Sequence, residues 1–341
     1  MMTKGGPVAT LKDVAREAGV SVTTASAALR GDAAVKATTR EKVVRAAQVV
    51  HYSVNASARF LKQGRSDIIA FVVPDLENPY FADLAWAISK EAARHGRQAI
   101  VQQTNASLAV ERDFLKRVNS PMCDGLILNL HNVPEQELHS LIGNHPAVLF
   151  EDYSAHPLYD NVALPLEPAF KAAFTYLRDR GYVHTAIVGG QRVAAGQFSA
   201  EGRNAGIDLA SKAMADAGLG SQTDIVPCEW TVEGGLRAAA AIMQNDLGYD
   251  ALFCMNDMIA FGLMRGLRSM GVDVPRDKAV FGFDGVSPAA YSSPLLSTIA
   301  VDFDGMARSA VSMLVSRIDG DSDTPVRRET VGFRLVRGES A

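Results

Sequence analysis

The sequence predicts an N-terminal, all-α helix-turn-helix headpiece followed by an α/β core of two lobes, each built on a parallel, doubly wound sheet. Three observations lead to this fold class. From Leu11 to Lys62 the apolar residues recur at helical spacing, with no alternating strand pattern. After Asp67, short β-branched or apolar runs alternate with amphipathic helices, which is typical of parallel sheets with crossover helices. This rhythm restarts near Thr185, which indicates a second lobe.

The first predicted helix carries four apolar residues on one face, at i, i+3, i+4 and i+7: Leu11, Val14, Ala15 and Ala18. Gly19 ends that helix, and Ser21 is placed to N-cap a second helix that runs through Leu29 and stops at Gly31. A helix, a tight glycine turn and a short second helix form the geometry in which the second helix lies in the major groove of DNA.

A third helix is expected near Thr38, since Thr38 and Glu41 have capping-box spacing. Asn55 offers a cap for a fourth, brief helix over Ala56–Lys62, and residues 63–66 read as a linker. The expected domains are therefore a headpiece at 1–53 and a hinge helix with its linker at 54–66.

The core, 67–341, is expected to contain strands at Ile68–Val73, Ala99–Gln102, Gly125–Asn129, Ala147–Phe150, Thr185–Val188, Asp224–Val226, Ala251–Cys254, Ala279–Phe283, Ser297–Ala300 and Arg334–Val336, with helices between them. We expect an N-lobe at about 67–165 and 299–325 and a C-lobe at about 166–297 and 326–341. Ligands of such sheets bind beyond the carboxyl ends of the strands, so a cleft between the lobes is predicted.

Charge is divided unevenly along the 341 residues. Residues 1–65 hold 11 Lys and Arg against 4 Asp and Glu, a net charge of +7, whereas the remainder carries −11. A small basic unit on an acidic body is expected where one end of the chain meets a polyanion such as DNA. A solvated, lysine-rich leader would have the same charge, so the motifs decide between the two.

The cysteines and the hydropathy pattern indicate a cytoplasmic protein. Cys123, Cys228 and Cys254 are odd in number, widely spaced and set in apolar segments, which predicts buried free thiols in a reducing compartment. Residues 1–10 hold no apolar stretch of signal-peptide length, and no run reaches the roughly 18 apolar residues of a membrane span. Export and membrane contact are therefore not expected.

The motif Leu11-Lys12-Asp13-Val14-Ala15-Arg16-Glu17-Ala18-Gly19-Val20-Ser21 closely resembles the opening of the lactose- and galactose-repressor (LacI/GalR) family of bacterial transcription regulators. The likeness continues through Thr38–Val43, His51-Tyr52 and Asn55–Lys62, so it covers the whole headpiece and hinge. The alternative, an unrelated three-helix module that binds protein, has no such motif.

The resemblance implies the residues that meet operator DNA. Val22, Thr23 and Ala27 occupy the positions from which the family reads base edges, and Ala27 and Ala28 offer only methyl groups that can pack on thymine. Leu61 matches the leucine that wedges into the minor groove, although alone it would read as a core leucine. The implied DNA-binding residues are Thr10, Ser21, Val22, Thr23, Thr24, Ser26, Ala27, Arg30, Thr39, Asn55, Ala58, Leu61 and Lys62.

The core resembles the periplasmic-binding-protein-like core of the same family, through motifs such as Asn78-Pro79-Tyr80-Phe81 and Gly282-Phe283-Asp284-Gly285. Arg203 and Asp284 match an arginine and an aspartate that bind the small effector in the family. Trp230 matches the position of an aromatic residue that stacks on the effector. Each of these residues taken alone could equally be structural. The implied effector-binding residues are Asp75, Tyr80, Phe81, Asn129, Asp152, Tyr153, Arg203, Trp230, Asn256 and Asp284.

The function predicted is a sequence-specific DNA-binding regulator, a repressor, controlled by a sugar or related metabolite. A homodimer matches two-fold operator symmetry, and no leucine-heptad tail follows the last strand, which favours a dimer over a tetramer. No nucleophile elbow, phosphate loop or metal-ligand spacing is present, so neither an enzyme, a cofactor nor a bound metal is expected. The alternative is a sugar-binding protein of a transport or sensing system that does not bind DNA.

Overall fold

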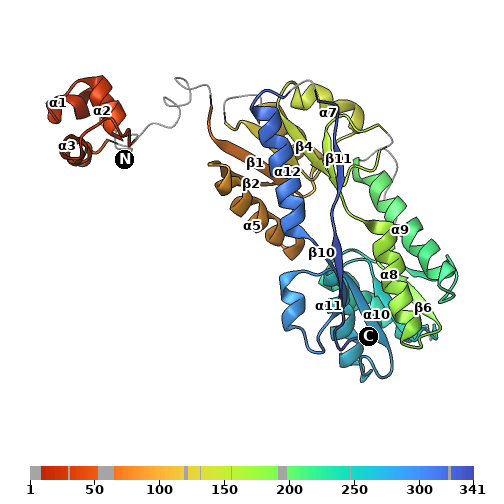
Figure 1. Cartoon of the computed structure of the whole chain (residues 1–341). Coiled ribbons are helices and arrows are strands. Elements are labelled where there is room, and N and C mark those ends of the chain that lie inside the picture. The colour runs from red at the N-terminus through yellow and green to blue at the C-terminus, as the bar shows by residue number, and fades with distance from the viewer. Residues whose placement is uncertain are drawn as a thin grey trace, which may run out of the picture. The chain divides into compact units, whose positions relative to one another are not determined.

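The computed structural model describes residues 9–29, 31–52, 65–118, 122–130, 132–154, 156–190, 198–245, 247–321 and 324–341, with only the backbone described for 135 and 198–203. The chain divides into two compact units, Met1–Ser66 and Asp67–Ala341. Figure 1 labels helices and strands of both units.

The first unit holds three described helices: α1 (Leu11–Glu17), α2 (Val22–Leu29) and α3 (Ala37–Val49). Their apolar faces meet in one small core: Val14, Ala15, Ala18, Ala25, Ala28, Val43, Ala46 and Ala47. Gly19 has φ +59° and turns the chain after α1, and the Val20 N–H donates to the Ala15 carbonyl at 3.0 Å. Ser21 then caps α2, because its Oγ accepts from the Thr24 N–H at 3.0 Å.

The expected capping box of the third helix is wrong. Helix α3 begins at Ala37, its N-cap is Lys36, and no side chain caps it, so Thr38 lies inside the first turn. Arg40 holds the preceding loop instead, since its guanidinium donates to the Asp32 carbonyl at 2.7 Å. Lys36 fills the cap position, so the N–H groups of the first turn are left for an outside acceptor.

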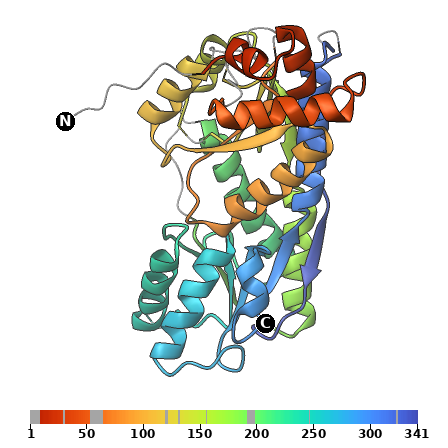
Figure 2. The same ribbon diagram turned by 90° about the vertical axis from the view of Figure 1, so that its left-hand side faces the viewer.

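The second unit contains two six-stranded sheets (Figures 1 and 2). Sheet A has the order β11-β5-β4-β3-β1-β2 and is parallel throughout. Sheet B has the order β12-β10-β9-β8-β6-β7, in which β12 alone runs antiparallel. Their strands are β1 (Ile68–Val73), β2 (Gln98–Gln103), β3 (Gly125–Leu128), β4 (Ala147–Phe150), β5 (Asp160–Ala163), β6 (Thr185–Val188), β7 (Ile225–Val226), β8 (Ala251–Cys254), β9 (Ala279–Asp284), β10 (Ser297–Val301), β11 (Arg328–Thr330) and β12 (Phe333–Val336).

Helices cover both faces of each sheet. The N-lobe carries α5 (Pro79–Arg94), α6 (Leu108–Val118), α7 (Glu135–Ile142) and α12 (Phe303–Ile318), and the C-lobe carries α8 (Leu166–Asp179), α9 (Phe198–Asp216), α10 (Val232–Gln244), α11 (Asp257–Ser269) and the 3-10 helix η1 (Ser287–Tyr291). No helix within the described ranges is long and apolar enough to cross a membrane.

The side chains of β1 alternate between two hydrophobic cores, one on each face of sheet A. Ile69, Phe71 and Val73 join the core cluster that contains the apolar face of α5, whereas Ala70 and Val72 join the cluster under α6 and α7. Successive side chains of a strand point to opposite faces, and both faces are covered here. The central strands are therefore continuously apolar, as the sequence indicates for β1, β3 and β8.

The chain passes between the lobes three times, and the passing segments are hydrogen-bonded to one another. The Val331 N–H donates to the Ala163 carbonyl at 3.1 Å, and the Asp302 N–H donates to the Gly332 carbonyl at 3.2 Å. The second and third passages lie near residues 302 and 331, rather than near 298 and 326 as expected. The reason is that β10 completes its pairing with β9 before the chain leaves sheet B, and the short edge strand β11 returns to sheet A.

Two strands, β5 and β11, were not expected from the sequence. Strand β5 opens with the polar pair Asp160-Asn161, and β11 is exposed along its three residues, so neither shows an apolar run. Both form through parallel pairing with a neighbour at the edge of sheet A.

Candidate functional site

The headpiece presents one polar face of α2. Ser21, Val22 and Thr23 are exposed, and Thr24, Ser26 and Ala27 are half-buried at the edge of that face. The opposite face is apolar, since Ala25 and Ala28 are buried in the core. The interpretation of Ala28 as a methyl group facing DNA is therefore wrong, whereas Ala27 stays accessible.

A shallow groove of about 340 Å³ runs from this face to the start of α3. Its lining has no acidic side chain: Thr23, Thr24, Ala27, Ala34, Val35, Lys36 and Thr39. The first turn of α3 also lacks an acidic residue. Free N–H groups at a helix N-terminus and a nearby lysine favour a phosphate group, so the groove has the chemistry of a DNA-backbone contact.

The remaining expected DNA contacts divide into two groups. Thr10 is exposed at the start of α1, where its hydroxyl donates to Asp13 Oδ2 at 2.7 Å. The others lie outside the described residues, together with the expected hinge helix: Arg30, Asn55, Ala58, Leu61 and Lys62.

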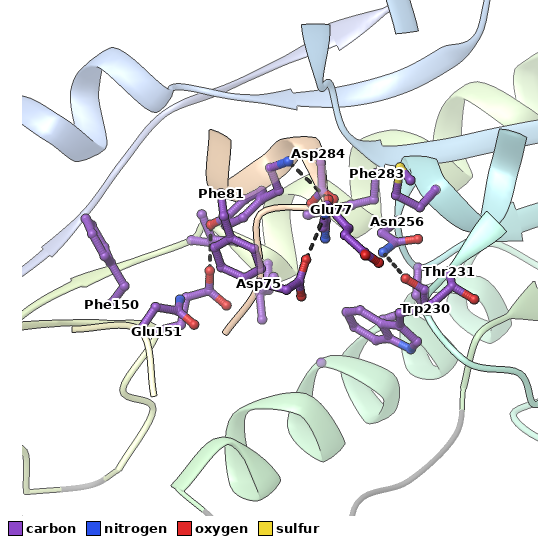
Figure 3. Close-up of a pocket in the computed structure, with 18 of the residues that line it drawn as sticks. Asp75, Glu77, Phe81, Phe150, Glu151, Trp230, Thr231, Asn256, Phe283 and Asp284 are labelled. Atoms are coloured by element: carbon purple, nitrogen blue, oxygen red, sulfur yellow. Dashed lines mark hydrogen bonds between the residues drawn. The ribbon is translucent and has the colours of Figure 1, made fainter. Parts of the chain in front are cut away.

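The core contains a cavity of about 410 Å³ between its two lobes (Figure 3). The residues that line it follow the carboxyl ends of strands in both sheets, as the prediction from parallel sheets requires. Asp75 and Asn129 follow β1 and β3, Glu151 follows β4, and Asn256 and Asp284 lie at the ends of β8 and β9. Seven aromatic rings complete the wall: Tyr80, Phe81, Phe150, Tyr153, Phe170, Trp230 and Phe283.

Several polar groups of the cavity are held by the fold. Asn256 caps α11, since its Oδ1 accepts from the Ile259 N–H at 2.9 Å, and its Nδ2 donates to the Trp230 carbonyl at 3.3 Å. The indole N–H of Trp230 donates to the Gly189 carbonyl. Because both residues are fixed by these bonds, they shape the wall of the cavity.

Two buried side chains of the cavity have no such partner. Asn129 is 5% exposed and Asp284 is 8% exposed. Neither the Asn129 carboxamide nor the Asp284 carboxylate forms a hydrogen bond with another residue of the described structure. Buried polar groups are nearly always hydrogen-bonded, so both groups have the chemistry of a ligand contact.

Burial and neighbouring charges raise the pKa values of acidic groups in and beside the cavity. Burial raises the pKa of Asp284 well above its ordinary value, and the charges of Asp257 and Glu151 raise it further. Burial also raises the pKa of Asp257, which accepts from Thr298 Oγ1 at 2.7 Å and from the Val286 N–H at 2.9 Å. Burial likewise raises the pKa of Tyr80, whose hydroxyl donates to Glu151 Oε1 at 2.6 Å.

Two of these acidic residues, at the ends of β4 and β9, have an unusual backbone conformation. Glu151 has φ +59° and Asp284 has φ +112°, both in a region that L-residues rarely adopt. Such conformations cost about 1–3 kcal/mol each and cluster at binding sites, where the surrounding structure imposes them.

The structure brings most of the expected effector residues together. Asp75, Tyr80, Phe81, Asn129, Tyr153, Trp230, Asn256 and Asp284 all line the cavity, and the side chain of Arg203 is outside the described part. The prediction that Asp152 contacts the effector is wrong. Its Oδ1 accepts from the Ser154 N–H at 2.9 Å, and the residue does not line the cavity. Its neighbour Glu151 lines it instead.

Three acidic residues of the lining were not predicted from the sequence: Glu77, Glu151 and Glu233. Glu151 directly follows the expected strand at 147–150, so its position at a strand end could have identified it as a cavity residue. Glu77 and Glu233 are exposed, close to the starts of α5 and α10, and no motif marks them.

A helical unit with an exposed, acid-free recognition face, joined to a two-lobed core that encloses a polar and aromatic cavity, defines a ligand-responsive DNA-binding regulator. A family model described as "Bacterial regulatory proteins, lacI family" matches residues 10–55, and one described as "Periplasmic binding protein-like domain" matches residues 174–341. The chain is 30% identical over 321 residues to the HTH-type transcriptional repressor PurR of Vibrio cholerae serotype O1, covering 91% of this chain and 92% of that relative. The chain therefore belongs to the lacI family of bacterial regulatory proteins.

Further relatives agree with this assignment. The PurR repressor of Escherichia coli is 30% identical over 344 residues, with 98% of this chain and 97% of the relative covered. Among solved structures, the lac repressor dimer bound to operator and the anti-inducer ONPF has a TM-score of 0.82 at 23% identity, over 98% of this chain and 99% of that chain. A LacI-type transcription regulator from Bifidobacterium animalis has a TM-score of 0.71 at 27% identity, over 80% and 99%. The predicted family and fold class are confirmed.

Proposed function

We propose that this regulator is a cytoplasmic, nucleoid-associated repressor that binds operator DNA as a homodimer under the control of a small effector, a sugar or related metabolite, in the cleft. One observation carries the proposal: the cavity between the lobes holds Asp284 and Asn129 buried and with no hydrogen-bond partner for their side chains among the described residues. A cavity of about 410 Å³ with a few converging polar groups has the size and lining of a small-molecule site.

The DNA-binding part of the proposal rests on the headpiece. Val22, Thr23 and Ala27 read base edges from α2, while Thr24 and Thr39 contact the backbone along the acid-free groove. Ser21, Ser26, Thr10 and the residues of the hinge, 54–66, complete the contact, with Leu61 as the minor-groove wedge. Residues 1–53 then form the reading unit, and residues 67–341 form the sensor and the dimer contact.

Control of DNA binding follows from the way the lobes are joined. An effector touches both lobes at once, so its binding favours one arrangement of the lobes about the three hydrogen-bonded passages. Coupling of this kind is typically about 1–3 kcal/mol. Either sign of the response is compatible with the architecture, since an effector can favour the DNA-bound or the free arrangement.

The proposal is supported by what related proteins bind. The lac repressor structure is described with operator and an anti-inducer, and another regulator of similar fold, CelR, is described with cellobiose at a TM-score of 0.70 and 24% identity. The relatives carry the name of repressors and not of enzymes, and we infer that this chain performs no catalysis.

Binding of the full chain to a duplex selected from random-sequence DNA tests the proposal. For 6–10 phosphate contacts, affinity should fall by about 10³–10⁵ between roughly 50 and 200 mM salt. Asp284→Ala should leave the affinity for DNA unchanged and abolish the response to small molecules, whereas Asp113→Ala, on exposed α6, should retain the response. Absence of any salt-dependent DNA binding would instead favour a ligand-binding protein of a transport or sensing system.

A further inference from the structure

The cavity between the lobes has an excess of negative charge. Its described lining holds five carboxylates and no lysine, arginine or histidine: Asp75, Glu77, Glu151, Glu233 and Asp284. Arg203, expected from the sequence and outside the described side chains, would offset at most one of these charges. A cleft lined by one sign of charge attracts ligands of the opposite sign, because its low-dielectric walls concentrate the field.

Glu151 and Asp284 bring this charge together from opposite lobes (Figure 3). Both side chains line the same cavity, and the charge of Glu151 contributes to the raised pKa of Asp284. Tyr80 donates one hydrogen bond to Glu151, whereas the Asp284 carboxylate receives none from the described residues. A cation bound between the two carboxylates would satisfy Asp284 and remove the repulsion between them.

The other lining residues suit a cationic ring. Aromatic faces attract cations as well as apolar ring surfaces, and the cavity offers Tyr80, Phe81 and Trp230 beside the carboxylates. Asn129 is buried without a partner and can both donate to and accept from a hydroxyl group. A ring with hydroxyl groups and one charged nitrogen therefore matches Asn129, Asp284 and the aromatic wall of the cavity.

We infer that the effector is an organic cation, a hydroxylated ring with an ammonium group such as an amino sugar, whose charged nitrogen binds between Asp284 and Glu151. This inference rests on the proposed function, because it names the chemical class that occupies the proposed effector site. A neutral sugar leaves the two carboxylates facing each other, and an anionic sugar adds a further negative charge to the cavity.

Isothermal titration calorimetry of the full chain with four probes of one ring type tests the inference: D-glucosamine, D-glucose, N-acetyl-D-glucosamine and D-glucuronate. D-glucosamine should bind at least about tenfold more tightly than either neutral sugar, and D-glucuronate should bind most weakly. Asp284→Asn and Glu151→Gln should each reduce this preference for charge. The matched control Asp113→Asn removes an exposed carboxylate of α6 and should keep the preference.

The inference is overturned if the neutral or anionic sugars bind as tightly as D-glucosamine, if none of the four binds, or if both cavity variants keep the preference for charge. Anisotropy of the same protein with duplex DNA separates this failure from failure of the proposed function. A regulator that binds DNA and prefers a neutral sugar keeps its proposed function and loses the cationic effector.

Discussion

The backbone N–H and the hydroxyl of Ser287 both donate to the carboxylate of Asp83, at 2.7 and 2.5 Å. Asp83 lies on α5 in the N-lobe, and Ser287 opens η1 in the C-lobe, so this pair ties the lobes together. Ser287 follows Asp284 by three residues, and between them the Val286 N–H donates to the buried Asp257. A change at the Asp284 carboxylate is therefore close in the chain to a bond that joins the two lobes.

Asp83→Ala should shift the lobes toward an open arrangement. Hydrogen bonds to a charged group contribute about 1.5–3 kcal/mol, so binding of a cleft ligand should weaken by about tenfold or more. Small-angle scattering should report a larger radius of gyration for the unliganded variant. The control Asp304→Ala removes the exposed Lys90–Asp304 ion pair within the N-lobe and should change neither quantity. Unaltered ligand affinity in Asp83→Ala would show that this bond does not influence closure.

Asp257→Asn should flatten the dependence of stability on pH. Burial raises the pKa of Asp257 to about 7, so between about pH 4 and that value the folded state binds a proton that the unfolded chain has released. The stability contributed by this group is therefore present at low pH and lost as the pH rises through the folded value. An asparagine keeps a carboxamide oxygen that can accept from the Val286 N–H, as Asp257 does.

Thermal unfolding from about pH 5 to about pH 9 measures this effect. The variant should gain stability relative to the natural chain as the pH rises, and Asp113→Asn should follow the natural chain. Parallel curves for Asp257→Asn and the natural chain would mean that Asp257 is charged in the folded state.

Tryptophan emission should report the cleft selectively. Trp86 is 68% exposed on α5, whereas Trp230 lines the cavity, so Trp86→Phe leaves a single probe of ligand binding. The bound ligand should shift the emission of that variant, and Trp230→Phe should lose the shift. Trp230→Ala should also weaken binding of a cationic ligand by about thirtyfold, since a desolvated cation–π contact contributes about 2 kcal/mol. A shift that survives in Trp230→Phe would place the ligand elsewhere.

Asp160 should be essential for the stability of the N-lobe. Its fully buried carboxylate accepts from Arg317 Nη2 at 2.8 Å and from Arg327 Nη2 at 2.6 Å, which fastens α12 and the start of β11 to β5. Burial alone would raise the pKa of Asp160, but the hydrogen bonds from the two arginines outweigh it and the pKa is lowered.

Asp160→Asn leaves two guanidinium groups without their counter-charge and should cost about 3–5 kcal/mol of unfolding free energy. Urea denaturation monitored by circular dichroism provides the measurement. Breaking the exposed Asp113–Arg117 pair with Asp113→Asn should cost about 0–1 kcal/mol. Equal losses in the two variants would deny Asp160 this role.

The sequence predicts those parts of the structure that depend on short-range pattern. The spacing of Val14, Ala15 and Ala18 identifies the buried face of α1, and the apolar runs identify the central strands. The third cap was misplaced because a threonine inside a first turn and one at a cap look alike in sequence. Asp152 was predicted and its neighbour Glu151 was not, and one residue of register decides which side chain enters the cavity.

Long-range relationships could not be predicted. Asp83 and Ser287 are 204 residues apart, and the partners of Asp160 lie 157 and 167 residues away. No local pattern encodes which loops meet when two lobes close. The acidic excess of the cavity has the same origin, because its five carboxylates come from four separate segments of the two lobes.

Reciprocal titration of Trp86→Phe tests most directly whether the cleft controls the headpiece. The affinity of the tightest-binding probe is measured by Trp230 emission, with and without a saturating selected duplex, and the affinity for the duplex is measured with and without that probe. Linkage requires the two affinities to change by the same factor, about 5–150-fold for coupling of the usual size. A probe that binds the cleft with one affinity, whether or not DNA is bound, would contradict the account.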